Sequence, residues 1–280
     1  MAELRFVVDT EQSVSLQTYL REKVGISARL LKKLKHRENG ITRNGVLIRS
    51  IDTVRAGDVI LLDMGENTGT DPNSLLNVPI VYENESLIVF DKPAAMPVHE
   101  SHGHRGDTLA NYFASVYPEL TFRPVNRLDR DTSGLCLVAK DAHAANLLQG
   151  GFEKTYYAAV EGVTDEEGTI DAPIARECES LILRCVREDG KPSVTHYKRI
   201  DCNDTFSLLE IRLETGRTHQ IRVHFSYIGH PLAGDDMYGG NLNYISRQAL
   251  HCGKLTFRLP LTGEVVTVES PLPDDIKQLF

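Results

Sequence analysis

The sequence predicts an α+β protein: a large mixed or antiparallel sheet with flanking helices, preceded by a small unit of two helices and a hairpin. Two observations favour this fold class. From Pro79 onward, short strand-like runs alternate in mixed order with helical ones. Before it, residues 13–63 combine two amphipathic stretches with two Asn-Gly turn signals. A segment rich in Gly, Asn, Thr and Pro separates the two regions, so we expect units at 1–66 and 79–280 and a linker at 67–78.

The first unit is predicted from its apolar spacing. SVSLQTYLREKVG, residues 13–25, has apolar residues at helical spacing and stops at Gly25, a C-terminal helix signal. Ser27 suits the N-cap of a second helix, SARLLKKLKHR. Two Asn-Gly pairs on either side of ITR then predict tight turns, with VLI and VILLD as short strands.

The second unit is predicted to contain many strands of four to eight residues. The expected strands are IVYE, LIVFD, LCLVAK, TYYAAVEG, FSLLEIRLE and VVTVES, and the expected helices are DTLANYFASVY, AHAANLLQGGF and HQIRVHFSYIG. Thr218 is placed to cap the last helix, which Gly229 ends.

The composition is typical of a globular protein, with 41% hydrophobic and 25% charged residues. No apolar stretch approaches the ~20 residues that span a bilayer, and the start of the chain has no signal-peptide pattern. We therefore expect a cytoplasmic protein without a membrane partner. Five cysteines without a C-x-x-C pair predict reduced core thiols and neither a zinc site nor a disulfide framework.

The charge is distributed unevenly along the chain. The whole chain has a net charge of -8, whereas residues 1–63 hold 11 Lys and Arg against 8 Asp and Glu. The second predicted helix carries the cations Arg29, Lys32, Lys33, Lys35 and Arg37. A solvated face would explain one Lys-rich helix, but a basic helix followed by a hairpin resembles the ribosomal-protein-S-four-type RNA-binding module. That resemblance implies that these cations contact RNA phosphates.

A loop with four charges precedes the predicted strand LCLVA. In RPVNRLDRDTSGL, residues 123–135, two arginines alternate with Asp129 and Asp131 and are followed by Thr-Ser-Gly, which suits a tight turn. Asp131 is expected to accept hydrogen bonds from backbone donors of that turn. Taken alone, such a string is usually a structural ion-pair network.

Two further stretches carry candidate functional residues. Lys154 and Tyr156 alternate at the start of a strand and so share a face, where the tyrosine either packs in the core or offers a ring for stacking on a base. Arg222 lies beside the apolar stripe of a predicted helix, which predicts a carboxylate partner. The spacing of His219, His224 and His230 is not a standard metal-binding pattern.

Together these stretches resemble the RluA-type pseudouridine synthases, which modify uridines in ribosomal and transfer RNA. The motifs are NRLDRDTSG at 126–134, KTY at 154–156 and GRTHQIR at 216–222, with supporting matches in FDKPAAMPVH, GKPSVTHY, HPLAGDDMYG and ALHCGKLTF. They occur in the family's order over roughly residues 80–275. Asn126 stands where the family usually has His, so a role that needs an ionising imidazole is in doubt there.

The resemblance implies a role for each matching residue. Asp129 would be the catalytic aspartate, Tyr156 the ring against the target uracil and Arg222 the ion-pair partner of Asp129. Arg127, Arg217 and His219 would contact substrate or brace the loop. The reaction needs no cofactor and no metal, and the aspartate acts either by attacking C1′ or by removing the C2′ proton. Large-subunit ribosomal RNA is the first expected partner and transfer RNA the second, with no obligate protein partner.

Two alternatives remain open from the sequence. A glycosidase or nucleoside hydrolase would also use an aspartate at an anomeric carbon, but it needs a second carboxylate, for which Asp131 is the only candidate in these stretches. A catalytically silent RNA-binding or ribosome-assembly protein could keep the fold as a platform. Asn126 favours this alternative, whereas the combination of Asp129, Tyr156 and Arg222 counts against it.

Overall fold

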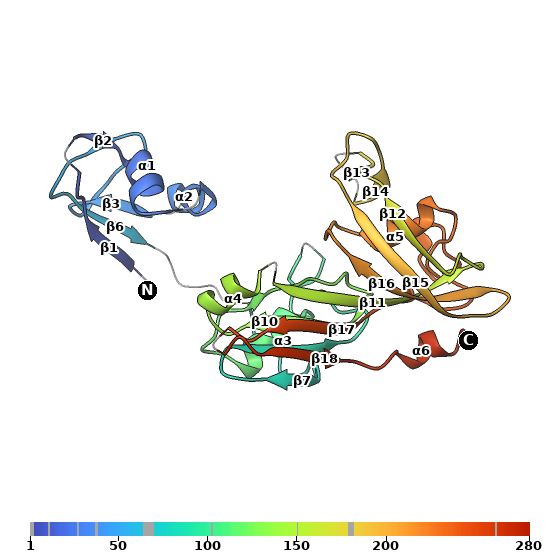
Figure 1. Ribbon diagram of the computed structural model, residues 1–280. Coiled ribbons are helices and arrows are strands. Elements are labelled where there is room, and N and C mark those ends of the chain that lie inside the picture. The colour runs from blue at the N-terminus through green and yellow to red at the C-terminus, as the bar shows by residue number, and fades with distance from the viewer. Residues whose placement is uncertain are drawn as a thin grey trace. The chain divides into compact units, whose positions relative to one another are not determined.

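The computed structural model describes residues 3–10, 12–26, 28–36, 39–63, 70–101, 103–149, 151–178, 182–260 and 262–280 (Figure 1). The chain divides into two compact units, Met1–Gly69 and Thr70–Phe280. The division lies within the segment expected as a linker, and residues 64–69 lie outside the described residues.

The N-terminal unit packs two short helical segments against small sheets. Its strands are β1 (Glu3–Val7), β6 (Val59–Asp63), β3 (Ile41–Arg43) and β4 (Val46–Leu47), hydrogen-bonded in that order, and β2 (Val14–Ser15), which pairs with β5 (Thr53–Val54). Helix α1 (Leu16–Thr18) continues into a π-helical turn, η1 (Tyr19–Lys23), and α2 (Ala28–Lys35) follows. Apolar side chains such as Leu16, Leu20 and Leu34 are buried between them.

The predicted helices and hairpin are present, with two corrections. Val14 lies in strand β2 and not in the first helix, and β1 was not expected at all. ELRFV alternates polar and apolar residues over Glu3–Phe6, a strand pattern that the sequence analysis did not use, and the strand pairs with β6. Asn44 and Gly45 have φ angles of 52° and 82°, as the tight turn requires. The predicted cap Ser27 lies outside the described residues.

The larger unit is built on one mixed sheet, as the sequence predicted. Its main path, in spatial order, is β12 (Glu167–Asp171), β15 (Val194–Cys202), β16 (Phe206–Leu213), β11 (Phe152–Glu161), β17 (Leu250–Arg258), β10 (Ser133–Ala139), β8 (Leu87–Lys92) and β7 (Ile80–Glu83). Strand β18 (Val265–Glu269) pairs with β17, and β9 (Arg123–Pro124) pairs with β10. Only the β10–β17 pair is parallel among these pairings of described strands.

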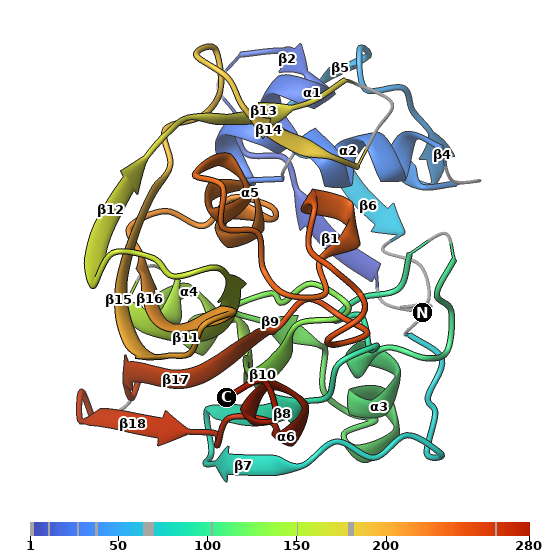
Figure 2. The same ribbon diagram turned by 90° about the vertical axis from the view of Figure 1, so that its right-hand side faces the viewer.

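The helices of this unit flank the sheet. They are α3 (Leu109–Val116), α4 (Ala142–Leu148), α5 (Gln220–Tyr227), a 3-10 turn η2 (Asp236–Tyr238) and α6 (Asp274–Lys277). A separate hairpin joins β13 (Ile174–Arg176) to β14 (Arg184–Val186). Figure 2 shows α5 on the inner side of the curve that β12, β15 and β16 make. No helix among the described residues is long and apolar enough to span a membrane.

Strand β10 is the centre of the core. Every residue from Ser133 to Ala139 is buried, because neighbouring strands and helices cover both faces. Gly134 has a φ of 106°, and a Cβ there would lie 2.3 Å from the carbonyl oxygen of Cys252, its partner across the parallel pair. Glycine is therefore required where the charged loop enters the sheet. Of the predicted core thiols, Cys136 and Cys252 are buried, whereas Cys178 and Cys202 are exposed, which corrects that expectation.

Helix α5 is tied to the sheet by a buried histidine. The Nε2 of His224 lies 2.9 Å from the carbonyl oxygen of Ala172, and its Nδ1 lies 2.9 Å from the hydroxyl of Thr195. Since a carbonyl only accepts, Nε2 carries the proton and Nδ1 accepts from Thr195. Burial lowers the pKa of His224, so the neutral ring is the form that the fold keeps.

We predict that the protein loses stability as the pH falls through about 6.5. Burial lowers the pKa of three histidines, namely His219, His224 and His251. The unfolded chain therefore binds more protons than the folded chain below that pH, and each such histidine lowers the free energy of unfolding by up to about 1.4 kcal/mol per pH unit. Urea unfolding at pH 7.5 and 5.5 measures the difference.

The matched variants are His224→Gln at the buried site and His143→Gln on the exposed face of α4. His224→Gln should flatten the dependence between these pH values, and His143→Gln should leave it as in the wild type. An identical pH dependence in all three proteins would contradict the assignment.

Candidate active site

The charged loop that contains Asp129 is anchored by the side chain of Asn126. This amide is 5% exposed, its Nδ2 donates to the carbonyl of Leu135 at 3.0 Å, and its Oδ1 accepts from the N–H of Leu137 at 2.7 Å. Both polar groups of Asn126 are thus used on the backbone of β10. In this chain the position acts as a brace and does not require an ionising group.

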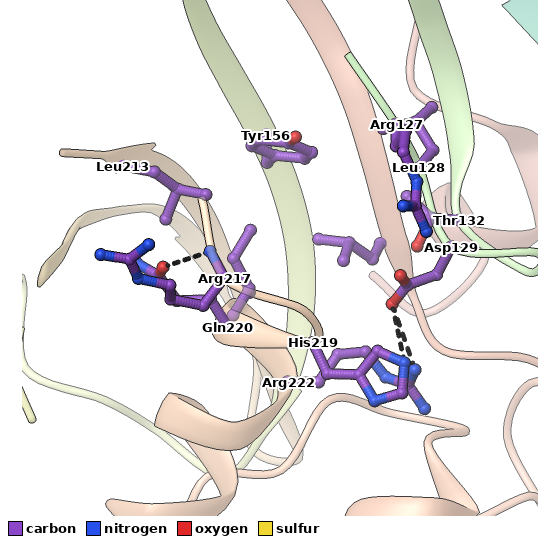
Figure 3. A pocket seen from close by; sticks show the side chains of 12 residues that line it. Arg127, Leu128, Asp129, Thr132, Tyr156, Leu213, Arg217, His219, Gln220 and Arg222 are labelled. Carbon is purple, nitrogen blue, oxygen red and sulfur yellow. Dashed lines mark hydrogen bonds and ion pairs between the residues drawn. The ribbon is translucent and has the colours of Figure 1, made fainter. Parts of the chain in front are cut away.

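Asp129 faces a pocket together with Arg222 and His219. Its Oδ2 lies 3.2 Å from Nη1 of Arg222 and 3.8 Å from Nε2 of His219 (Figure 3). The side chain is 31% exposed, so a substrate can reach the carboxylate. The predicted contact between Asp129 and Arg222 is present.

Arg222 has a second acidic partner that was not expected from the sequence. Its Nε and Nη2 donate to both carboxylate oxygens of Asp235, at 2.6 and 2.7 Å, and both residues are almost fully buried. Burial lowers the pKa of Arg222, but the charges and hydrogen bonds of Asp235 and Asp129 outweigh it and raise the pKa. Arg222 is therefore a permanent cation beside Asp129. The sequence motif HPLAGDDMYG contains this partner, but the motif alone does not show whether Asp235 or Asp236 is buried against Arg222.

Tyr156 forms an apolar wall of the pocket. It projects from β11, is 6% exposed, and stands across the pocket from the Asp129 loop in Figure 3. Leu128, Leu213, Ile221 and Leu250 also line this cavity of about 70 Å³. Burial raises the pKa of Tyr156 well above its ordinary value, so the phenol stays neutral. A flat neutral ring beside aliphatic side chains is suited to contact a base.

His219 is positioned by Tyr238, a residue that the sequence motifs did not single out. The Nδ1 of His219 lies 2.8 Å from the Tyr238 hydroxyl, which also accepts a hydrogen bond of 3.1 Å from the backbone N–H of Arg184. The ring of Tyr238 lies under the Arg222 guanidinium, 4.9 Å from its carbon. Burial lowers the pKa of His219, which favours its neutral form.

The start of α5 corrects the predicted cap. His219, not Thr218, is the residue before the first turn; it has a left-handed φ of 57° and makes no side-chain capping bond. The side chain of Gln220 instead ties the helix to the turn before it, since its Oε1 accepts from the N–H of Arg217 at 3.0 Å and the hydroxyl of Thr215 at 2.9 Å. This turn directs His219 toward Asp129.

The remaining candidates lie at the edge of the site. Arg127 is exposed and lines both the pocket and a groove of about 630 Å³ that continues it, a size within the ~300–1,000 Å³ of ligand sites. The guanidinium of Arg217 points away from Asp129 in Figure 3, and its Nε donates to the carbonyl of Pro192 at 3.2 Å. Contrary to expectation, the Asp131 carboxylate accepts its hydrogen bonds from the Arg130 guanidinium, at 2.8 to 3.1 Å.

The basic helix of the N-terminal unit is only partly described. Lys32 and Lys35 are exposed on α2, and the Nζ of Lys35 donates to Oε1 of Gln17 at 3.1 Å. The side chains of Arg29 and Lys33 and the whole of Arg37 lie outside the described residues, so their role stays a prediction. Among the described residues, no group of three His, Cys, Asp or Glu side chains is arranged to hold a metal ion.

A buried lysine holds the loop that contains Asp129 through hydrogen bonds to its backbone. Lys92, at the end of β8, is fully buried, and its Nζ donates to the carbonyls of Pro93 and Met96, each at 2.7 Å, and of Arg130 at 3.0 Å. Burial lowers the pKa of Lys92 to about 8. The ammonium group joins two loops, and all its acceptors are carbonyl oxygens. One acceptor belongs to Arg130, the residue directly after Asp129.

We predict that Lys92→Met lowers the free energy of unfolding by roughly 1–3 kcal/mol, because it leaves these carbonyls without a donor. Denaturant unfolding measures this. The control is Lys254→Met, at a lysine whose side chain is 40% exposed and paired with Glu269 at 2.9 Å, which should change stability by less than about 0.5 kcal/mol. If Lys92→Met were as stable as the wild type, the desolvation of the ammonium would outweigh its hydrogen bonds.

Comparisons with known proteins identify the family of this chain. Residues 86–227 match the family described as RNA pseudouridylate synthase. The chain is 39% identical over 269 residues to the uncharacterized RNA pseudouridine synthase YjbO of Bacillus subtilis, covering 92% of this chain and 95% of that protein. It is 40% identical over 229 residues to ribosomal large subunit pseudouridine synthase D of Haemophilus influenzae, covering 73% and 71%.

A solved structure supports the same assignment. Human RNA pseudouridylate synthase domain containing 1 aligns with a TM-score of 0.59 and 29% identity, over 72% of this chain and 86% of that one. The resemblance seen in the sequence motifs is thereby confirmed for the larger unit. The chain belongs to the RNA pseudouridylate synthase family, whose members are isomerases that convert uridine in RNA to pseudouridine.

Proposed function

We propose that this protein isomerises specific uridines of large-subunit ribosomal RNA to pseudouridine, with Asp129 as the reacting carboxylate and without a cofactor. The observation that carries the proposal is the contact of 3.2 Å between Asp129 and the buried cation Arg222, at the mouth of a pocket walled by Tyr156. The relative from Haemophilus influenzae is named for the large ribosomal subunit, which favours that RNA. Transfer RNA is the second candidate.

The residues of the pocket match the steps of this isomerisation. The N1–C1′ bond of uridine breaks, the uracil turns, C5 bonds to C1′, and the proton on C5 is lost while N1 gains one. Asp129 would attack C1′ or remove the C2′ proton, and Arg222 holds the carboxylate in place. Tyr156 would stack on the uracil, which offsets part of the few kcal/mol that extracting a base costs.

His219 is placed to assist by moving a proton. In the tautomer in which the Tyr238 hydroxyl donates to Nδ1, the Nε2 of His219 carries the proton and faces Asp129 at 3.8 Å. A neutral imidazole there can donate to the carboxylate or to the turning base.

A hydrolase is less consistent with the site. Such an enzyme needs a second free carboxylate ~5–9 Å from the first. Asp129 is the only acid among the described residues that line the pocket. Asp131 is paired with Arg130, and Asp235 is paired with Arg222. Both are therefore committed to arginines.

The proposal includes the N-terminal unit and the location of the protein. Residues 1–66 would act as the S-four-type RNA-binding module, through Arg29, Lys32, Lys33, Lys35 and Arg37, and residues 79–280 as the catalytic domain. Support comes from the exposed Lys32 and Lys35 on α2. The protein would act in the cytoplasm, where ribosomal RNA is found.

We predict that Asp129→Asn abolishes activity, with a loss of roughly 10⁴-fold or more, because the reacting group is removed. Carbodiimide mapping of pseudouridine in RNA from cells lacking the protein would identify the site that wild type restores. Asp131→Asn, in the same loop, is the control and should restore it. If all sites persist without the protein, after redundant enzymes are excluded, the chain is an RNA-binding platform and not an isomerase.

We predict that Tyr238→Phe lowers kcat/KM by about tenfold, because His219 is deprived of its orienting hydrogen bond, worth ~1 kcal/mol or more. The ring stays and keeps its contact with Arg222, so the melting temperature should change little. Tyr244→Phe, an exposed tyrosine with its ring 4.9 Å from that of Phe206, is the control. An unchanged kcat/KM for Tyr238→Phe would exclude a positioning role for its hydroxyl.

A further inference from the structure

A second hollow of about 450 Å³ adjoins the active pocket in the same unit. We call it the basic hollow, since its lining includes the cations Arg176, Arg184, Lys191 and Arg217 and a single acid, Asp189. The two arginines of the hairpin come from β13 and β14, and Figure 1 shows this hairpin beyond the ends of β12 and β15. The residues of the proposed reaction do not line it, and Arg217 is the one candidate site residue among its described lining residues.

The backbone forces these cations together. Arg176 and Arg184 are direct partners in the antiparallel β13–β14 pair. Lys191 lies on the other side of β13, where its backbone exchanges two hydrogen bonds of 2.9 Å with Ile174. Gly190 permits this approach, because a Cβ there would lie 2.6 Å from the backbone of Ile174. Like charges on paired strand positions are destabilising unless something neutralises them.

Arg176, Arg184 and Lys191 form no ion pair with the described residues of the chain. Arg187 engages both oxygens of Asp189, the only acid in the lining. Arg184 donates to the carbonyls of Ile182 and Leu183, which are uncharged. Arg176 and Lys191 are exposed and have no ion-pair partner among the described residues. The whole chain has a net charge of -8, so acids to pair with these cations are plentiful in the sequence. A cation cluster that is nevertheless left without ion pairs is suited to bind an anion.

The hollow is continuous with the catalytic residues. Arg217 lines both the hollow and the pocket, and Thr218 lines both the hollow and the groove beside Asp129. The backbone N–H of Arg184 also donates to Tyr238, which contacts His219. If a base of a polyanion such as a nucleic acid occupies the pocket, the negatively charged groups next to that base would therefore lie at the hollow.

We propose that the basic hollow binds the phosphate backbone of the RNA strand beside the target uridine, through Arg176, Arg184 and Lys191. This inference rests on the proposed function for the identity of the polyanion. Arginine forks and a flexible lysine suit phosphate oxygens, and contacts of this kind position a strand without reading its sequence.

The test compares Arg176→Gln, Lys191→Gln and the double variant with Lys198→Gln. Lys198 is an exposed lysine on β15 that lines a hollow together with the acids Glu166, Glu167 and Asp201, so it controls for the removal of one positive charge. Binding of a fluorescent single-stranded RNA of mixed sequence is measured by anisotropy at several NaCl concentrations, and melting temperatures show that each variant is folded.

Removal of one cation that binds a phosphate should reduce the slope of log K against log[salt] by about 0.7. The double variant should bind roughly tenfold more weakly at physiological salt, and Lys198→Gln should match the wild type. In assays of pseudouridine formation on ribosomal RNA from cells lacking the protein, the double variant should raise KM and leave kcat unchanged, since the cations lie away from the reacting atoms.

The outcomes separate this inference from the proposed function. A double variant with the wild-type salt slope and KM, in an enzyme that does form pseudouridine, rejects the hollow and keeps the function. A reduced slope in a protein that forms no pseudouridine on any ribosomal RNA rejects the function and keeps the hollow as an RNA-binding site. A slope lowered equally by Lys198→Gln would show that net charge alone acts, and it would overturn the inference.

Discussion

The ion-pair system centred on Arg222 is the constraint on which the site depends. A buried guanidinium costs several kcal/mol unless it is paired, and Asp235 supplies a bidentate partner at 2.6 and 2.7 Å. That pairing leaves Nη1 free to reach Asp129 at 3.2 Å. Asp235 is 1% exposed, and the side chain of Asp129, the proposed reacting acid, is 31% exposed, so one cation pairs with an acid of the core and with an acid of the pocket. The two acids differ in role because only one of them faces the pocket.

The loop itself is held by contacts that are distant in sequence. Asn126 binds the backbone of β10, Lys92 binds the carbonyl of Arg130, and Gly134 allows β10 to enter its parallel pairing with β17. One short segment is thus fixed to a fully buried strand in three ways. These are the hydrogen bonds of an amide, the hydrogen bonds of an ammonium group, and a close backbone approach that only a residue without a Cβ allows. Pre-organisation of this kind places a carboxylate without a conformational search at the moment of reaction.

The sequence could predict the sheet and one contact of the candidate site, but not the contacts that position it. The alternating runs were enough for the mixed sheet, and the resemblance of the motifs to a known family implied the contact between Asp129 and Arg222 that the structure contains. Asp235, Tyr238 and Lys92 were missed, because tertiary structure alone decides which residue each of them contacts. Asp235 is one acid among several in the sequence, Tyr238 lies in a short turn, and Lys92 is a lysine in a buried position. The predicted cap at Thr218 was wrong because the chain adopts a left-handed conformation at His219, so the helix begins one residue later than expected. Strand β1 was missed although Glu3–Phe6 alternate, because a short alternating run does not show which strand it pairs with, here β6.

Net charge proved a poor guide to where an anion could bind. Residues 1–63 carry an excess of cations, and the rest of the chain is acidic in total, which alone would assign all RNA contacts to the first unit. The larger unit nevertheless has one hollow in which cations outnumber acids, with Arg176 and Lys191 beside the pocket, and another in which Glu166 and Glu167 lie. Because salt screens charges beyond about 8–10 Å, a phosphate senses the nearest cluster and not the total. An acidic domain can therefore attract RNA at one face, and its remaining acids oppose binding at other faces.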